Sequence, residues 1–416
     1  MLDLKAIRSA PDAARSALAR RGDGSHERLD RVLELDERRR AILPELEGLR
    51  AEKNSASKQI GELQRSGEDA TDAIAAVKAV GERQKELDAE LKAVEEELEP
   101  ALAALPNPPA ESAADEDTVL KEVGEAGKAG KDHLDLVGGL VDLEAGAKVA
   151  GSRFAYLKGP LVMLELALVR WALGLLEERG FEPVVPPVLV REEALFGTGF
   201  LPDTEQQIYR VPEDHLYLVG TSEVPLAGLH MGDVLDEGDL PVRYAGFSPC
   251  FRREAGAAGR DARGLFRVHQ FDKVEMFAFV RPEDGLDEHE RILAIEEEIM
   301  GGLGLPYRVV NIAVDDLGSS AAKKFDLEVW LPGQERYREL TSCSNTTDYQ
   351  ARRLDARYRP ADGDGTRHLH TLNGTAVAVG RTIIALVENG QQEDGSVVLP
   401  DVLAQFGGPT CLEPAV

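Results

Sequence analysis

The sequence predicts an α+β protein in which an N-terminal antiparallel coiled-coil hairpin precedes a larger domain of mixed strands and helices. A sustained heptad pattern over residues 28–65, and a second one after a short polar turn, predict the hairpin. From residue 152 to about residue 390, strand-like and helix-like runs alternate, which predicts the larger domain. A chain of 416 residues has room for roughly two or three domains.

The two heptad helices carry apolar seams that are interrupted at a few positions. The seams of the first helix are Leu35, Ile42, Leu49, Ala56, Leu63 and Val32, Arg39, Leu46, Lys53, Ile60. The seams of the second helix are Val77, Gln84, Leu91, Leu98 and Val80, Leu87, Val94, Ala101. A turn is predicted at residues 66–69, so the helices should pair antiparallel. Pro44 is expected to kink the first helix, and Pro100 with the LPNPP run at 105–109 is expected to end the second.

Segments on either side of the hairpin are less regular. Residues 1–25 are interpreted as a short helix that ends at a Gly-Asp-Gly break. Residues 110–150 are rich in alanine, glycine and acidic side chains, which is typical of a linker, and they lead into an expected helix near 133–148. A strand-like entry, a long apolar helix and a proline-rich extended segment follow from residue 152.

Bulk properties point to a cytoplasmic protein without a membrane span. No apolar run reaches the length that crosses a bilayer, and the first twenty residues lack the apolar core of a signal peptide. Cys250, Cys343 and Cys411 are too widely spaced for a disulfide framework or a zinc site, which favours a reducing compartment. The formal net charge of −27 argues only weakly against a nucleic-acid partner, because such partners contact local patches.

An arginine-rich window, residues 248–275, stands out in this acidic chain. It contains Arg252, Arg253, Arg260, Arg263, Arg267 and Lys273. Strand-like runs over 242–252 and 265–280 flank a glycine- and alanine-rich loop. Arginines presented on such a hairpin suit a polyphosphate, because guanidinium groups bind phosphate oxygens in a bidentate way.

This window resembles motif 2 of the class II aminoacyl-tRNA synthetases. The matching residues are Arg252-Arg253-Glu254, Arg267 and Phe271, and the longer string EAG-x-x-GRD-x-RGL-x-RVHQF-x-KVE is similar to the bacterial-type seryl-tRNA synthetases. The resemblance implies an antiparallel-sheet catalytic domain flanked by helices over 151–416, a tRNA-binding arm over 1–105 and a linker over 106–150. It also implies activation of L-serine with ATP and transfer of the seryl group to the 3′ end of tRNA-Ser. Whether tRNA-Sec is a second acceptor is left open at this point.

The resemblance assigns the ATP site to three segments. In motif 2, Arg252 is expected at the α-phosphate and Glu254 at the adenine amino group. The other motif 2 residues expected to contact ATP are Arg253, Val268 and Phe271, although core packing is an open alternative for Phe271. The segment Glu339-Leu340-Thr341-Ser342 is expected at the end of a strand and resembles the family's ATP- and magnesium-binding segment, with Glu339 and Ser342 as Mg²⁺ ligands. Arg381, in TLNGTAVAVGRTIIALVEN, resembles the motif 3 arginine at the γ-phosphate. Arg252, Glu254 and Arg381 are thus the catalytic candidates.

A second group of residues resembles the serine site of the family. Its members are Thr221, Ser222, Glu223, Glu275, Asn345 and Thr375. Two carboxylates suit the ammonium and hydroxyl groups of serine, and Thr375 falls where many relatives have serine. A salt bridge to a hairpin arginine is an alternative role for Glu275. His269 is expected to make a structural hydrogen bond, because the family mechanism uses no histidine base.

The resemblance also supplies the expected partners. In the family the helical arm binds tRNA-Ser, and the locally basic stretch Arg50, Lys53, Lys58 and Arg65 provides candidate phosphate contacts here, although the arm over 26–100 is net −7. A spacer role is the alternative. Pro187, in VVPPVLV, resembles motif 1 and implies a homodimer. A specialised paralogue, serving inhibitor self-resistance or biosynthetic supply of Ser-tRNA, remains the alternative function.

Overall fold

The chain folds into two compact units in the computed structural model. The arm unit comprises residues 2–106, and the sheet unit comprises residues 107–416 together with Met1. The structure describes residues 1–202, 207–255, 264–363 and 365–414. None of the helices in this described part has the length and hydropathy that crossing a bilayer requires.

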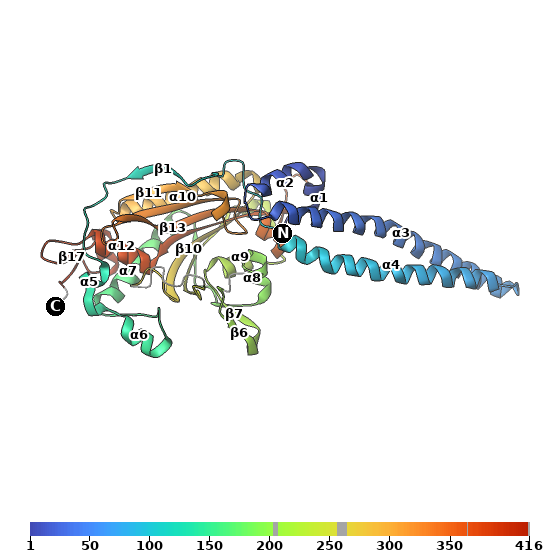
Figure 1. Cartoon of the computed structure of the whole chain (residues 1–416), viewed down its shortest axis with the longest axis horizontal. Coiled ribbons are helices and arrows are strands. Elements are labelled where there is room, and N and C mark those ends of the chain that lie inside the picture. The colour runs from blue at the N-terminus through green and yellow to red at the C-terminus, as the bar shows by residue number, and fades with distance from the viewer. Residues whose placement is uncertain (203–206, 256–263, 364, 415–416) are drawn as a thin grey trace. The chain divides into compact units, whose positions relative to one another are not determined.

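Helices α3 (Ser25–Ser66) and α4 (Thr71–Ala103) form the predicted hairpin. Figure 1 shows the two helices running side by side, α3 in dark blue and α4 in lighter blue. Helix α3 ends at Gly67, whose φ of 76° is the left-handed conformation that glycine adopts readily. All predicted seam residues are buried or half-buried. The cations in the first helix's seams meet polar partners on α4, with Arg39 3.2 Å from Glu95 and Lys53 3.2 Å from Gln84.

Two prolines of the arm lie inside its helices. Helix α3 continues through Pro44 as a single element. Helix α4 passes Pro100 and ends at Ala103, between Pro100 and the LPNPP run that together were expected to end it. Both prolines are exposed, and the coiled-coil packing on the opposite side keeps the flanking turns helical. One short helix was expected before residue 25, but there are two, α1 (Leu4–Ser9) and α2 (Pro11–Ala19), because Pro11 begins a new helix.

The sheet unit is organised around an eight-stranded sheet in the order β1-β11-β12-β13-β16-β10-β9-β4. Every neighbouring pair is antiparallel except β4 and β9. The strands are β1 (Thr118–Val123), β11 (Tyr307–Asn311), β12 (Lys323–Leu331), β13 (Arg336–Thr347), β16 (His370–Ala378), β10 (Gln270–Val280), β9 (Val242–Phe251) and β4 (Glu182–Val184). The antiparallel sheet that the resemblance implies is thereby confirmed.

The two faces of the sheet pack against different helices. Long helices α7 (Pro160–Glu178), α10 (Gly285–Gly302) and α12 (Val379–Asn389) form the main core with Val274, Met276 and Ala278 of β10. The alternate residues Phe277 and Phe279 belong to a second core with α9 (Glu223–Gly228) and α11 (Tyr349–Leu354). Because successive strand residues point to opposite faces, α9 and α11 lie on the face away from the long helices.

Three segments differ from the sequence-based expectation. Strand β10 begins at Gln270 and not at residue 265, and the preceding residues form bends. Strand β13 continues to Thr347, so the segment 339–342 lies inside the strand and not at its end. Residues 106–150, expected as a linker with one helix near 133–148, contain the edge strand β1 and two helices over that stretch, α5 (His133–Val137) and α6 (Leu143–Ala150).

The remaining elements are short and connect the larger ones. They are α8 (Glu192–Thr198), β2 (Val141–Asp142), β3 (Tyr156–Leu157), β5 (Leu189–Val190), β6 (Arg210–Val211), β7 (Leu216–Leu218), β8 (Val234–Asp236), β14 (Arg357–Arg359), β15 (Arg367–His368), β17 (Val397–Val398) and β18 (Cys411–Leu412). Strands β5, β6 and β7 form a small sheet beside the site described below.

Candidate active site

A cavity of about 720 Å³ lies in the sheet unit, bordered by β10, β13 and β16 and by the residues before α9. Most residues of the predicted ATP and serine sites line it. They are Arg252, Glu254, Val268, Phe271, Glu339, Leu340, Thr341, Ser342 and Arg381 from the ATP group, and Thr221, Glu223, Glu275 and Thr375 from the serine group. Segments far apart in the sequence thus meet at one cavity.

A β-bulge in β13 determines which side chains face this cavity. Residues 339 and 342 are three positions apart, and a regular strand would place them on opposite faces. In the structure, Ser342 lies opposite Asp326 and Glu339 lies opposite Glu328, and these two partners are only two positions apart. Leu340 is the extra residue. The bulge therefore brings the Glu339 carboxylate and the Ser342 hydroxyl to the same face.

Electrostatics keep the Glu339 carboxylate ionised. Burial would raise its pKa, but Arg381 and Lys324 outweigh burial and lower the pKa below its usual value. The Arg381 Nη1 atom lies 3.3 Å from Glu339 Oε2 and donates to the Glu339 backbone oxygen at 2.9 Å. An ionised carboxylate beside a hydroxyl fits the oxygen ligands that Mg²⁺ prefers, with phosphates and waters completing its shell.

Residues of the arginine-rich window hold one another at the cavity wall. The Arg252 guanidinium carbon lies 5.4 Å from the centroid of the Phe271 ring. The Arg252 N–H donates to the His269 oxygen at 3.0 Å, and His269 Nδ1 donates to the Arg252 oxygen at 2.9 Å. The structural role expected for His269 is thus confirmed. Glu254, with a positive φ of 49°, accepts a hydrogen bond from Arg267 at 2.9 Å. Arg260 and Arg263 lie outside the described residues.

Two buried glutamates share the inner end of the cavity. Glu223 Oε1 accepts hydrogen bonds from Gln350 at 2.7 Å and from Asn373 at 3.0 Å. Burial, followed by repulsion from Glu275, raises the pKa of Glu223 to about 7. Burial also raises the pKa of Glu275, although Lys273 opposes it. One lysine beside two carboxyl groups leaves this end of the cavity suited to a further cation.

The partner of Glu275 in the described part of the chain is a lysine. Glu275 forms an ion pair with Lys273 on its own strand, and no ion pair joins it to Arg252, Arg253 or Arg267, the window arginines that the structure describes. Lys273 also donates to the Thr221 hydroxyl at 2.8 Å. The Thr375 hydroxyl lies 3.5 Å from Glu275, so threonine retains the polar contact and adds a methyl group to the wall.

Several predicted residues do not present their side chains to the cavity. Ser222 is fully buried, with its hydroxyl 3.0 Å from that of Ser248. The Asn345 amide donates to the Gly285 oxygen at 3.2 Å on the α10 side of the sheet, so its expected contact with substrate is not supported. Thr341 borders the cavity, but its hydroxyl donates to Glu296 of α10 at 3.1 Å. Alternation along β13 places both residues there. Arg253 does not line the cavity, and its N–H donates to the Gln207 oxygen at 2.9 Å.

Several cavity residues were not singled out by sequence reasoning, and those with polar or aromatic side chains beside the predicted site include Phe266, Lys273, Lys324 and Asn373. Lys273 was counted as a charge of the window, without a partner, and its position two residues before Glu275 was the available signal. Asn373 was overlooked although it lies in the quoted motif 3 string, two residues before Thr375 on the same strand face. Nothing local indicated Lys324, which reaches the site from β12.

Three of the arm residues expected to contact tRNA, Arg50, Lys53 and Arg65, have partners within the arm. Arg50 lies 3.0 Å from Asp88, and Arg65 donates to the Gly61 oxygen at 2.9 Å. Arg50, Lys58 and Arg65 are exposed, and Lys53 is half-buried. Three of the four candidate tRNA contacts are therefore accessible on the hairpin surface.

Comparisons with known proteins agree with this site. Residues 1–109 match the model of the seryl-tRNA synthetase N-terminal domain, and residues 207–390 match that of the tRNA synthetase class II core domain (G, H, P, S and T). Serine--tRNA ligases of Thermobifida fusca and Rubrobacter xylanophilus are 47% and 48% identical to the chain. Their alignments cover all of this chain and 99% and 100% of those proteins.

Solved structures give the same result. Seryl-tRNA synthetase from Pyrococcus horikoshii complexed with ATP superposes with a TM-score of 0.95 at 40% identity over 100% of both chains. Cytoplasmic serine-tRNA ligase from Naegleria fowleri in complex with AMP has a TM-score of 0.87 at 33% identity, covering 98% of this chain and 96% of that one. The chain belongs to the seryl-tRNA synthetase family of class II aminoacyl-tRNA synthetases.

Proposed function

We propose that this protein is a serine–tRNA ligase that activates L-serine with ATP to seryl-adenylate and transfers the seryl group to the 3′ end of tRNA-Ser. One observation carries the proposal: a single cavity joins arginines suited to a polyphosphate with two glutamates suited to an ammonium group. The names of the full-length relatives and the nucleotides in the two similar structures support it.

In the first step, a serine carboxylate oxygen attacks the α-phosphorus of ATP and pyrophosphate leaves. This step needs no protein nucleophile, so positioning and charge stabilisation supply the catalysis. We assign the α-phosphate to Arg252, which is exposed above the Phe271 ring, and adenine to the surface of that ring. Arg381, fixed by Glu339, is placed to bind the terminal phosphates.

Magnesium fits the donor set on β13. Glu339 and Ser342 would hold the ion, because the bulge brings their oxygens to the same face and Glu339 is kept ionised. When bound, Mg²⁺ would neutralise charge on the ATP phosphates and favour departure of pyrophosphate.

Serine selection is assigned to the inner end of the cavity. The ammonium group would bind the carboxylate of Glu223, while Glu275 and the Thr375 hydroxyl would contact the serine hydroxyl. Alanine would leave those buried polar groups without a partner, which makes a strong basis for rejection. The Thr375 methyl group narrows the space for the larger side chain of threonine.

We assign tRNA binding to the arm unit and both chemical steps to the sheet unit. The accessible cations Arg50, Lys58 and Arg65 support phosphate contacts on the hairpin. An alternative role as a specialised paralogue gains no support from the comparisons.

A homodimer fits an apolar surface near motif 1. Helix α7 exposes Val162, Met163 and Leu166 by 39%, 48% and 54%, and Val185, just after β4, is 81% exposed. An apolar surface of this kind is typical of a protein interface. We place the dimer contact there and the protein in the cytoplasm, where charged tRNA is used.

Aminoacylation tests the proposal directly. Purified protein should attach radiolabelled serine to tRNA-Ser transcripts, and periodate oxidation of the tRNA 3′ end should prevent the attachment. A parallel reaction with tRNA-Sec transcripts decides the second acceptor. Failure to charge either tRNA with serine, in protein that binds ATP, would contradict the proposal.

A further inference from the structure

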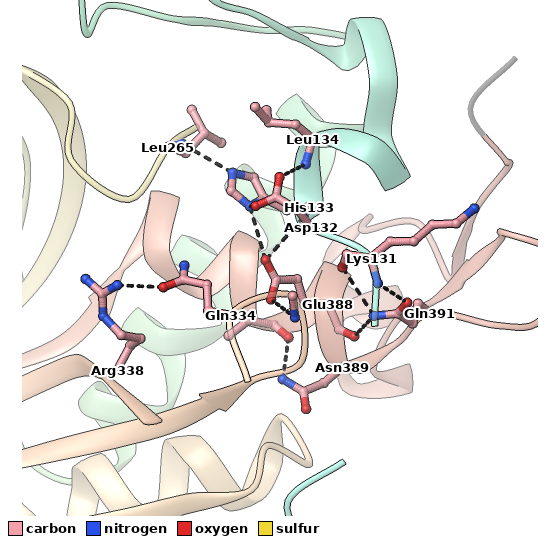
Figure 2. Close-up of polar contacts among 12 residues, drawn as sticks. Lys131, Asp132, His133, Leu134, Leu265, Gln334, Arg338, Glu388, Asn389 and Gln391 are labelled. Carbon is pink, nitrogen blue, oxygen red and sulfur yellow. Dashed lines mark hydrogen bonds and ion pairs between the residues drawn. The ribbon is translucent and has the colours of Figure 1, made fainter. Parts of the chain in front are cut away.

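A buried histidine outside the cavity joins three segments that are far apart in the sequence. His133 begins α5 and is 3% exposed. Its Nε2 atom accepts a hydrogen bond from the Leu265 N–H at 3.3 Å, and its Nδ1 atom lies 3.2 Å from Glu388 Oε1 near the end of α12. Figure 2 shows the ring between Leu265 and Glu388, with a dashed line to each.

These contacts determine which nitrogen of His133 carries the proton. The Leu265 N–H can only donate, so Nε2 must present its lone pair. The proton of the neutral ring therefore lies on Nδ1 and is donated to Glu388. Glu388 is fully buried and also accepts the His133 N–H at 3.2 Å and the Gly333 N–H at 2.9 Å. The carboxylate is thus held by three donors.

A metal ion is a weaker explanation for this cluster. Ligand atoms of Asp132, His133 and Glu388 lie within 4.8 Å of one another. However, the Nδ1 atom that faces both carboxylates carries a proton, and both Glu388 oxygens already accept backbone N–H groups. Asp132 caps α5 by accepting the Leu134 N–H at 2.9 Å. The network is complete without an ion.

The segment that His133 holds is part of the cavity wall. Leu265 and Phe266 both line the cavity, and the Phe266 ring centroid lies 4.6 Å from the Arg381 guanidinium carbon and 3.8 Å from that of Arg338. The backbone at Gly264, just before Leu265, also packs closely against His133. A Cβ atom added to Gly264 would lie only 2.3 Å from His133 Nε2, so a larger residue would not fit there. Helix α12 therefore holds this segment at two points, through Arg381 near its start and through Glu388 near its end.

We propose that His133 is a positioning residue for ATP: by holding the Leu265 N–H, it fixes the Leu265–Phe266 wall against Arg381. This inference rests on the proposed function, because its effect is measured as binding of ATP during serine activation. His133 is not among the residues that line the cavity, so its loss should act through Leu265 and Phe266, changing the KM for ATP and sparing the KM for serine.

Two isosteric substitutions separate the two ring nitrogens. In His133→Gln, the amide oxygen can take the place of Nε2 and accept the Leu265 N–H. In His133→Asn, the amide can take the place of Nδ1 and still contact Glu388, but nothing replaces Nε2. We expect the Asn variant to raise the KM for ATP about tenfold in ATP–pyrophosphate exchange, because a buried N–H loses its acceptor. The Gln variant should stay within about twofold of the parent.

A matched control uses another buried histidine. His289 is 1% exposed, and its Nε2 atom lies 3.2 Å from the Cys343 oxygen beneath the sheet. His289→Asn should lower the Tm without separating the KM for ATP from the KM for serine. Equal ATP KM values for the two His133 variants, or a matching rise in the KM for serine, would overturn the proposal.

The tautomer can be measured in the unaltered protein, independently of folding of the variants and of activity. ¹⁵N chemical shifts of labelled histidine should show His133 protonated at Nδ1 and unprotonated at Nε2. A proton on Nε2 would overturn the proposal. Absence of serine-dependent exchange in the parent protein, with the Nδ1 tautomer present, would instead count against the proposed function.

Discussion

Replacing Glu223 with glutamine separates the role of its charge from the role of its shape. Among the described residues, both hydrogen bonds to the Glu223 carboxylate end on Oε1, from Gln350 and Asn373. In Glu223→Gln, the amide oxygen can keep both contacts. The amide NH₂ then replaces Oε2, which we assign to the serine ammonium group, and presents a donor where an acceptor is needed.

The expected loss of serine binding follows from the energy of a hydrogen bond to a charged group. Such a bond contributes about 1.5–3 kcal/mol, so the KM for serine should rise about 10- to 150-fold. The KM for ATP should change less, because the described hydrogen-bond partners of the Glu223 carboxylate are Gln350 and Asn373, neither of which is assigned to ATP.

The same substitution should stabilise the fold at alkaline pH. The pKa of Glu223 is raised from 4.5 to about 7, so the folded state favours the protonated carboxyl group. That preference stabilises the protein fully below pH 4.5 and is lost as the pH rises through about 7. Ionised Glu223 therefore costs the folded state about 3 kcal/mol at pH 8, and Glu223→Gln removes that cost.

Two measurements test this reasoning together. Serine-dependent ATP–pyrophosphate exchange gives both KM values, and thermal unfolding between pH 5 and pH 8.5 gives the Tm of parent and variant. We expect weaker serine binding together with a higher Tm at pH 8.5. An unchanged KM for serine, or a lower Tm at pH 8.5, would refute the argument, because structural damage lowers activity and stability together.

Three further predictions concern other parts of the molecule. Arg252→Ala should lower serine-dependent exchange at least about a hundredfold. Arg252→Lys should recover only part of that activity, because lysine cannot form the bidentate phosphate contact, and full activity in the lysine variant would disprove that contact. Glu45 and Arg83 lie 3.0 Å apart across the hairpin, so a short turn can join the two helices there in place of residues 46–82. This truncation should preserve exchange but strongly reduce tRNA charging. Equal loss of both activities would mean that the arm has a structural role. Burial and then Glu339 raise the pKa of Asp326 to about 8, so Asp326→Asn should reduce the loss of Tm between pH 6 and pH 9; an unchanged slope would contradict it.

Local patterns predicted those elements that bury a face regularly. The heptads of residues 28–65 repeat often enough to identify the coiled coil, and the cations at positions 39 and 53 did not prevent it because α4 offers them polar partners. The motif 3 string showed its strand-to-helix junction through a change from strand to helix periodicity, and Val379 begins α12 there.

Long-range pairing explains what could not be predicted. Strand β1 is exposed at all six positions, so its sequence TVLKEV lacks the alternation of apolar and polar residues by which a half-buried strand is predicted. Its partner β11 lies nearly two hundred residues later in the chain. The bulge at Leu340 is likewise a property of the register between β12 and β13. Without knowledge of the bulge, the faces on which Glu339, Thr341 and Asn345 lie could not be assigned from sequence, and the Asn345 amide contacts Gly285.

Amino-acid-dependent ATP–pyrophosphate exchange tests the central claim most directly. The purified protein is assayed with each of the twenty amino acids, in the absence of tRNA. Two buried glutamates beside one lysine, with a threonine hydroxyl at the wall, predict exchange with L-serine and little with alanine or threonine. Exchange that is fastest with another amino acid, or absent with serine, would contradict the account.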